Sequence, residues 1–89
     1  MNRQPVVSSN ITSIGYDADT CTLEVEFGKD EPDDPTNRIY RYRDVPVEIH
    51  AGLMSHPSRG RYLYRNIAYK FPYELIGTRG ELEGDPGMD

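Results

Sequence analysis

Apolar and polar residues alternate along three stretches in the first half of the chain. The clearest stretch is residues 20–28, whose apolar positions are Cys21, Leu23, Val25 and Phe27. Strict alternation predicts a β-strand with one buried side, so Thr22, Glu24 and Glu26 are expected on a solvated side. Weaker alternation predicts strands over residues 8–17 and 38–44. Together these segments predict a three-stranded antiparallel meander with one solvated face.

The pattern becomes helical in the second half of the chain. Asp44 can accept a hydrogen bond from a free amide at a helix start, and Pro46 suits a first turn because its missing N–H is not needed there. We therefore expect a helix over residues 46–55. Ser58 can cap a second helix over residues 59–66.

The C-terminal part divides into an extended segment and a tail. Residues 67–76 alternate around an interrupting Pro72, which predicts an extended segment on the sheet or at its edge. Residues 77–89 are acidic and almost without apolar side chains, so we expect a flexible tail. The predicted organisation is a single α+β domain over residues 1–76, with two short helices packed on one face of the three-stranded sheet.

Size and composition limit the classes of protein that need considering. Eighty-nine residues make one domain with a modest core. No apolar stretch is long enough to span a membrane, and the first residues do not form a signal peptide. A single cysteine excludes an internal disulfide framework. These features predict a cytoplasmic protein without a membrane partner.

Charged residues are sorted along the chain. Residues 37–79 carry eight Arg or Lys and three acidic residues, whereas residues 1–36 carry two basic and eight acidic residues. Residues 80–89 add four acidic residues, and the whole chain has a net charge of −5. A local basic surface can steer an anionic partner even when the net charge is negative.

Several short motifs occur in an order that resembles the KTSC domain family. They are Val7-Ser8-Ser9, Ile14-Gly15-Tyr16-Asp17, Leu23-Glu24-Val25-Glu26-Phe27, Tyr40-Arg41-Tyr42 with Val45-Pro46, Pro57-Ser58-Arg59-Gly60-Arg61-Tyr62, and Asn66-Ile67. The family occurs as a standalone domain in bacterial and phage-type proteins and at the C-terminal end of some lysyl-tRNA synthetases. Its central Tyr-x-Tyr is the hallmark motif, and the synthetase fusion suggests RNA binding. The acidic loop 28–37 and the acidic tail depart from the family pattern.

The two tyrosines of this hallmark motif allow two interpretations. Tyr40 and Tyr42 could stack on unpaired bases, as aromatic residues on open sheets do. In a meander they are also the large partners that Leu23 and Val25 need. Cross-strand packing therefore favours a core position for at least one of them.

The arginines of the same strand also have two interpretations. When both tyrosines face inward, Arg41 and Arg43 point the same way as Glu24 and Glu26. Cross-strand ion pairs are then the ordinary expectation, because opposite charges commonly pair on a solvated face. The alternative is a phosphate-contacting strip, which the glutamates would partly neutralise.

A basic cluster near the predicted second helix is the better candidate for an anion site. Arg61 and Arg65 lie one helical turn apart, and no acidic residue occurs between Glu48 and Glu74. The start of this helix also offers free amides and Gly60 for close approach of a phosphate. The alternative is a solvated basic face that pairs with the acidic loop or tail. The RNA-contacting residues are expected to be Arg41, Arg59, Arg61, Tyr64, Arg65 and Lys70.

Metal binding and catalysis have little support in the sequence. Residues 29–36 are acidic, but they lack the ligand order and the glycine of a calcium loop, so we expect a mobile loop. His50 and His56 lack further zinc ligands, and Cys21 is expected mid-strand on the apolar side. No set of acid, base and nucleophile emerges, and no cofactor is expected.

Two functions remain for a small non-enzymatic binding module. The first is RNA binding through the basic Arg and Tyr surface. The second is a protein–protein adaptor that uses a tyrosine-rich surface or the acidic loop. The sequence specifies neither the partner nor the oligomeric state.

Overall fold

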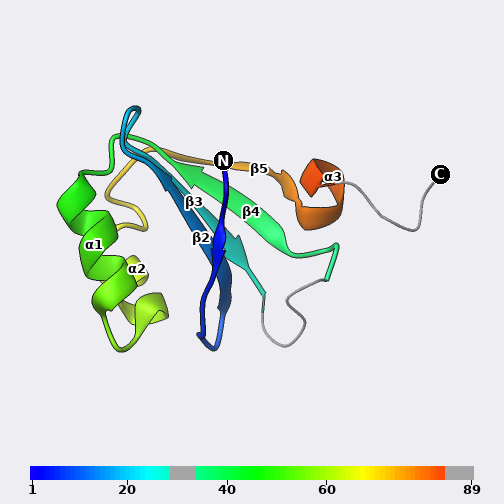
Figure 1. Cartoon of the computed structure of the whole chain (residues 1–89), viewed down its shortest axis with the longest axis horizontal. Helices are drawn as coiled ribbons and strands as arrows, with labels where there is room; N and C mark the ends of the chain where they lie inside the picture. Colours follow the sequence, from blue (N-terminus) through cyan, green and yellow to red (C-terminus); the bar gives the residue numbers. More distant parts are fainter. Residues whose placement is uncertain (29–33, 84–89) are drawn as a thin grey trace.

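A computed structural model describes residues 1–28 and 34–83, and in these residues one antiparallel sheet organises the fold (Figure 1). Five described strands are hydrogen-bonded in chain order, and every neighbouring pair is antiparallel. The strands are β1 (Gln4–Pro5), β2 (Ile11–Asp17), β3 (Thr22–Phe27), β4 (Arg38–Tyr42) and β5 (Tyr73–Thr78). The described helices are α1 (Val47–Ser55), α2 (Arg59–Asn66) and α3 (Arg79–Glu83).

The expected α+β fold is confirmed, whereas the expected numbers of strands and of helices are wrong, because the described residues form five strands and three helices. β2, β3 and β4 form the predicted meander, and β1 and β5 extend it at its two edges. β1 has only two residues, which is too short for any periodicity to be visible. Pro72 precedes β5 instead of interrupting it, and its carbonyl accepts a hydrogen bond from the Arg43 amide at 2.9 Å.

The two central helices begin and end close to the predicted residues, but neither has the expected capping hydrogen bond from a side chain. Pro46 occupies the position before α1. Asp44 has a left-handed backbone conformation with a φ of 60°. Ser58 precedes α2 without a capping bond from its hydroxyl. Its amide instead donates to Nδ1 of His56 at 3.0 Å.

The hydrophobic core lies between α1, α2 and one face of the sheet. Leu53 of α1 and Leu63 of α2 are buried against Leu23 and Val25 of β3. Tyr42 is also buried there with an exposed fraction of 5%, which confirms the core position for one tyrosine of the hallmark motif. Both helices lie on the same side of the sheet in Figure 1.

The opposite face of the sheet is covered, so the expectation of a solvated face is wrong. Glu24 and Glu26 on this face are 4% and 0% exposed. The N-terminal segment crosses it so closely that a Cβ atom on Gly15 would lie 2.9 Å from Cγ of Arg3. Arg79 of α3 reaches the same face and pairs with Glu26. We call this side of the sheet the polar face.

Two further expectations need correction. Cys21 is not mid-strand; it lies in the turn before β3 with a φ of 55°. The boundary expected at residue 76 falls within β5, and α3 continues the described chain to residue 83. Residues 29–33 of the acidic loop and 84–89 of the tail lie outside the described residues, so their expected mobility stays a prediction. None of the described helices has the length and apolarity needed to cross a membrane.

Candidate functional site

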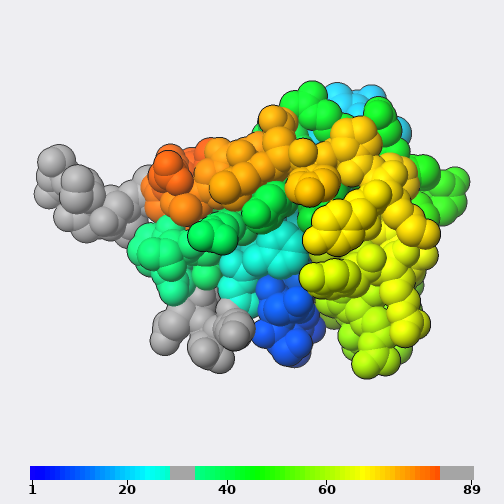
Figure 2. All heavy atoms as spheres, turned by 180° about the vertical axis from the view of Figure 1, so that it is seen from behind, coloured from blue at the N-terminus to red at the C-terminus, as the bar shows by residue number. Residues whose placement is uncertain are grey.

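A groove lined by tyrosines opens beside α2, where the helices no longer cover the sheet. Tyr40 pairs with Leu75 and Tyr42 with Tyr73 between β4 and β5, so these side chains share the face that carries the core. The groove has a volume of about 320 Å³. It is lined by Asn10, Phe27, Tyr40, Tyr42, Leu63, Tyr64, Ala68, Tyr69 and Tyr73, and we call it the tyrosine groove. Figure 2 shows this side, with the segment after α2 in yellow beside β3 and β4 in cyan and green.

The rings of the groove touch one another at an angle. Tyr69 contacts Tyr64 and Tyr73 with centroid distances of 6.4 and 6.2 Å and interplanar angles of 59° and 88°. Tyr73 continues the chain of contacts to Tyr42 at 5.9 Å and to Tyr40 at 6.3 Å. No two of these rings are stacked in parallel, so no ring face is covered by the parallel face of another ring in the cluster.

Tyr42 is the most deeply buried tyrosine of the groove, with an exposed fraction of 5%. Burial is the largest cause that raises the pKa of Tyr42 to about 12, and the neighbouring phenols of Tyr40, Tyr73, Tyr69 and Tyr64 contribute to the same shift. Three of the rings remain open to solvent, since Tyr64, Tyr69 and Tyr73 are 65%, 76% and 51% exposed. The groove therefore offers aromatic surface and phenolic hydrogen-bonding groups together.

Tyr69 has an unusual backbone conformation. It is the third residue of a turn closed by the Lys70 amide, which donates to the Ile67 carbonyl at 3.0 Å, and its φ is 66°. A positive φ at this turn position favours Gly or Asn. A bulky side chain there costs about 1 to 3 kcal/mol. Tyr69 is 76% exposed, so burial offsets little of that cost.

Three cationic residues lie close in the sequence to groove-lining residues, although none of the three lines the groove itself. Arg61 and Arg65 of α2 are exposed, and Lys70 directly follows Tyr69. At 3.6 residues per turn, Arg61 lies roughly 60° around the helix from Tyr64. Within residues 1–28 and 34–83, none of the three cations is ion-paired with a carboxylate. We call these residues the cationic rim, and sequence reasoning had placed all of them and Tyr64 in the site.

Arg59 is directed away from this rim. Its Nη2 donates to the Met54 carbonyl at 2.8 Å and its Nη1 to the Val7 carbonyl at 3.4 Å. The side chain thus ties the start of α2 to the end of α1 and to the N-terminal segment. The expected close approach of a phosphate at Gly60 is also blocked, because a Cβ atom there would lie 2.5 Å from Oδ1 of Asn10.

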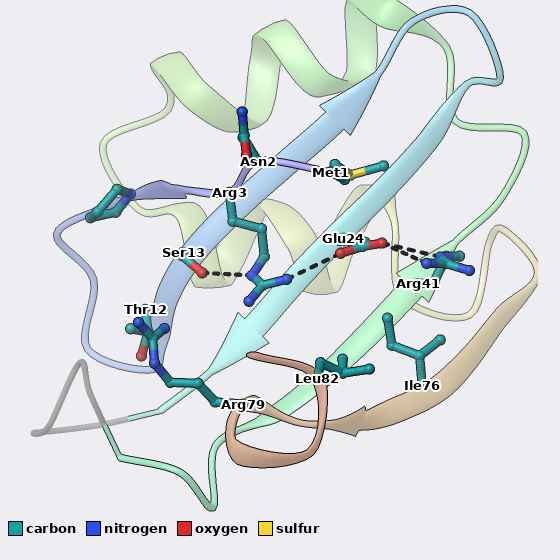
Figure 3. A pocket seen from close by; sticks show the side chains of 11 residues that line it. Met1, Asn2, Arg3, Thr12, Ser13, Glu24, Arg41, Ile76, Arg79 and Leu82 are labelled. Carbon is teal, nitrogen blue, oxygen red and sulfur yellow. Dashed lines mark hydrogen bonds and ion pairs between the residues drawn. The ribbon is translucent and has the colours of Figure 1, made fainter. Parts of the chain in front are cut away.

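Arg41 lies on the polar face, separated from the other predicted contacts by the sheet (Figure 3). Its Nε and Nη2 donate to Oε2 of Glu24 at 3.2 and 2.7 Å. The second oxygen of Glu24 accepts from Nη1 of Arg3 at 3.2 Å. The cross-strand ion pair was therefore the correct interpretation of Arg41. Arg43 pairs with Glu74 of β5 instead of with Glu24 or Glu26.

The polar face contains a larger cavity of about 640 Å³ (Figure 3). Glu24 and the guanidinium groups of Arg3, Arg41 and Arg79 line it, together with Ile76. Beneath it, Glu26 accepts hydrogen bonds from Arg79 at 2.8 Å, from Ser13 at 2.7 Å and from Asn37 at 3.0 Å. Each of these three arginines is thus paired with a buried glutamate.

Other titratable groups are scattered. His50 stacks on Tyr16 at 4.4 Å and 9°, and its burial lowers the pKa of the imidazole. Asp34 accepts hydrogen bonds from the amide and the hydroxyl of Thr36, which lower the pKa of its carboxyl group. In the part of the chain that the structure describes, no three His, Cys, Asp or Glu side chains gather closely enough to hold a metal ion.

Sequence reasoning missed two tyrosines of the groove, Tyr69 and Tyr73. The alternation of Tyr73 with Leu75 indicated that both lie on one face of a strand. The sequence did not show that Tyr73 pairs with Tyr42 across β4 and β5. Nothing in the sequence signalled the conformation of Tyr69.

A single antiparallel sheet with two helices on one face and an open aromatic groove defines a small α+β domain. The chain belongs to the KTSC domain family, whose model matches residues 7–71. It is similar to the crystal structure of a KTSC domain protein from Yersinia pestis, with 41% identity and a TM-score of 0.73 over 85% of this chain and 97% of that chain. It is also 37% identical over 62 residues to a protein of Stutzerimonas stutzeri (strain A1501) described as uncharacterized, covering 70% of this chain and 78% of that protein.

Proposed function

We propose that this domain is a non-enzymatic module that binds single-stranded RNA in the tyrosine groove. Unpaired bases stack on aromatic side chains, and each such contact is worth about 1 to 3 kcal/mol. Five tyrosines line the groove, and their rings are angled apart. Phosphates are recognised by cations near such a platform.

The observation that carries the proposal is the contrast in charge pairing. Arg61, Arg65 and Lys70 on the rim have no carboxylate partner among residues 1–28 and 34–83, whereas Arg41 and Arg43 each pair with a glutamate. Residues 49–73, which build the helical side of the groove, contain no acidic residue. No carboxylate of the described residues neutralises the rim, which supports the binding of an anion there.

A salt titration of RNA affinity tests this proposal. Binding of a labelled single-stranded RNA is measured at several salt concentrations for wild type and for Arg61→Ala with Arg65→Ala. Each phosphate contact contributes about −0.7 to the log–log slope, so the double variant should have a slope shallower by about 1.4. The fold should be unaffected because both side chains are exposed.

The matched control is Arg41→Ala with Arg43→Ala, which also removes two positive charges. Both of these arginines are ion-paired in the free protein, so their loss should leave the slope nearly unchanged. Equal slopes for the two double variants would mean that net charge, not the rim, determines binding. Absence of any RNA binding at low salt would reject the proposal.

An adaptor function is the second candidate, and the position of β5 at the edge of the sheet formed by the described residues favours it. The hydrogen bond from the Arg43 amide to the Pro72 carbonyl determines which residues of β5 are hydrogen-bonded to β4. Because hydrogen-bonded and non-hydrogen-bonded pairs alternate in an antiparallel sheet, the backbone N–H and C=O groups of Tyr73 and Leu75 point away from β4. Leu75 is also 52% exposed. An extended peptide could add to such an edge. Leu75→Lys should abolish binding of such a peptide and leave RNA binding intact.

A further inference from the structure

We propose that the tyrosine groove holds one unpaired nucleotide at a time, and that Tyr69 is the residue that clamps its base. This inference rests on the proposed RNA-binding function and specifies the ligand of the same site. It depends on three observations: the size of the groove, the conformation of Tyr69 and the charge of the rim.

The volume of the groove fits a single small ligand. About 320 Å³ is near the lower end of the range of roughly 300 to 1,000 Å³ that small-molecule sites occupy. A base inside a duplex has both faces covered by its neighbours, so only an unpaired base can present a face to these rings. The ligand unit is therefore one splayed-out nucleotide.

Tyr69 has the position and the strain expected of a clamp. Its ring bridges Tyr64 on α2 and Tyr73 on β5, and it is the most exposed ring of the groove. Gly or Asn would adopt this left-handed backbone conformation with less strain than Tyr69. The fold alone therefore does not require a tyrosine at this position. Strained backbone at an exposed aromatic residue is typical of a site whose ligand uses that side chain. The base contacts the ring of Tyr69, which closes the groove over it.

The charge of the rim selects an anionic ligand over a neutral ring. Arg65 and Lys70 each directly follow a tyrosine that lines the groove, Arg61 lies on the same helix as Tyr64, and the chain from residue 49 to 73 is free of acids. A nucleoside 5′-monophosphate carries both the flat base and the phosphate that this arrangement fits.

Titration of the full chain with uridine and adenosine 5′-monophosphate tests the inference. Binding is followed by amide chemical shifts, and RNA binding is measured in parallel. Tyr69→Gly should weaken nucleotide binding at least tenfold, while its urea midpoint equals or exceeds that of wild type because the strain is relieved. Tyr69→Phe keeps the ring and should stay within twofold of wild type.

Asp44→Gly is the matched control, because Asp44 is also an exposed residue with positive φ and lies outside the groove lining. It should leave nucleotide affinity unchanged. A Tyr69→Gly protein that loses stability but binds nucleotide normally would overturn the clamp. RNA binding by wild type without nucleotide binding would also overturn it and leave the proposed function standing. Nucleotide binding without RNA binding would reject the proposed function and retain the clamp.

Discussion

The two faces of the sheet both carry basic side chains but use them in opposite ways. On the polar face, Arg3, Arg41 and Arg79 donate to Glu24 or Glu26, whose carboxylates are almost fully buried. Beside the tyrosine groove, the cationic rim has no carboxylate partner among the described residues. The charge a surface offers to a partner is what remains after internal pairing, and counting arginines does not measure it.

The faces also differ in how they are covered. Segments from both ends of the described chain close over the polar face, where Met1, Ile76 and Leu82 line the cavity. On the other side, α1 and α2 cover the β2–β3 part of the sheet and leave the aromatic part of β4 and β5 open. One face is thus organised for stability, and we infer that the other is organised for binding.

Glu26→Ala should produce the largest loss of stability. Its side chain is 0% exposed and accepts hydrogen bonds from Ser13, Asn37 and Arg79. Removing one partner of a buried ion pair typically costs about 3 to 5 kcal/mol. Urea unfolding should show this loss, whereas Glu48→Ala on the exposed start of α1 should cost less than about 1 kcal/mol. Similar midpoints for the two variants would mean that the polar face is hydrated.

Arg79→Ala should cost less, because Glu26 keeps its bonds to Ser13 and Asn37. A buried charged group that loses one bond typically costs about 1 to 3 kcal/mol. The measurement is again the free energy of unfolding in urea. Arg79→Lys should recover part of the loss by restoring the charge. A silent Arg79→Ala would show that α3 does not contribute to the fold.

Comparing Arg41→Ala with Arg65→Ala tests the contrast between the faces directly. Arg41→Ala should lower stability by about 1 kcal/mol, since Glu24 retains Arg3, and should leave RNA affinity within twofold. Arg65→Ala should leave stability unchanged and weaken RNA binding at low salt. Unfolding and RNA titrations of both variants are needed. A swapped result would place the binding surface on the polar face.

The smallest effect should be a pH dependence of stability that comes from His50 of α1, on the helix-covered side of the sheet. Burial lowers the pKa of His50, so the unfolded chain binds this proton more readily than the folded domain does. The stability that this group contributes is complete above its ordinary value of about 6.5 and falls as the pH drops through the lower folded value. His50→Phe should reduce the difference in urea midpoint between pH 7.5 and 5. If the difference in urea midpoint between the two pH values is unchanged in this variant, groups other than His50 cause the pH dependence.

The sequence was sufficient where neighbours along the chain decide the structure. Strict alternation placed β3, and the bounds of α2 followed from local signals. Alternation shows that the two sides of a strand differ but does not show whether the polar side is exposed. Glu26 is buried because Arg79, 53 residues away, folds back onto it. No local pattern contains that contact.

The candidate site divides in the same way. Arg61, Tyr64 and Arg65 share one helix, and Lys70 follows in the next turn, so their proximity could be predicted. The direction of Arg59 depends on carbonyls of Met54 and Val7, which only the assembled fold brings together. The groove itself required the register of β5 and the left-handed conformation of Tyr69.

The clustering of tyrosines also gives the domain a built-in optical signal. The chain has seven tyrosines and no tryptophan, and five of the tyrosines line the groove. Intrinsic ultraviolet emission therefore comes mostly from rings at the candidate site, and the rest comes from Tyr16 and Tyr62 near the helices. Quenching of this emission reports occupancy of the groove without any attached dye. Exchange of excitation between rings about 6 Å apart makes the whole cluster respond when one ring is covered.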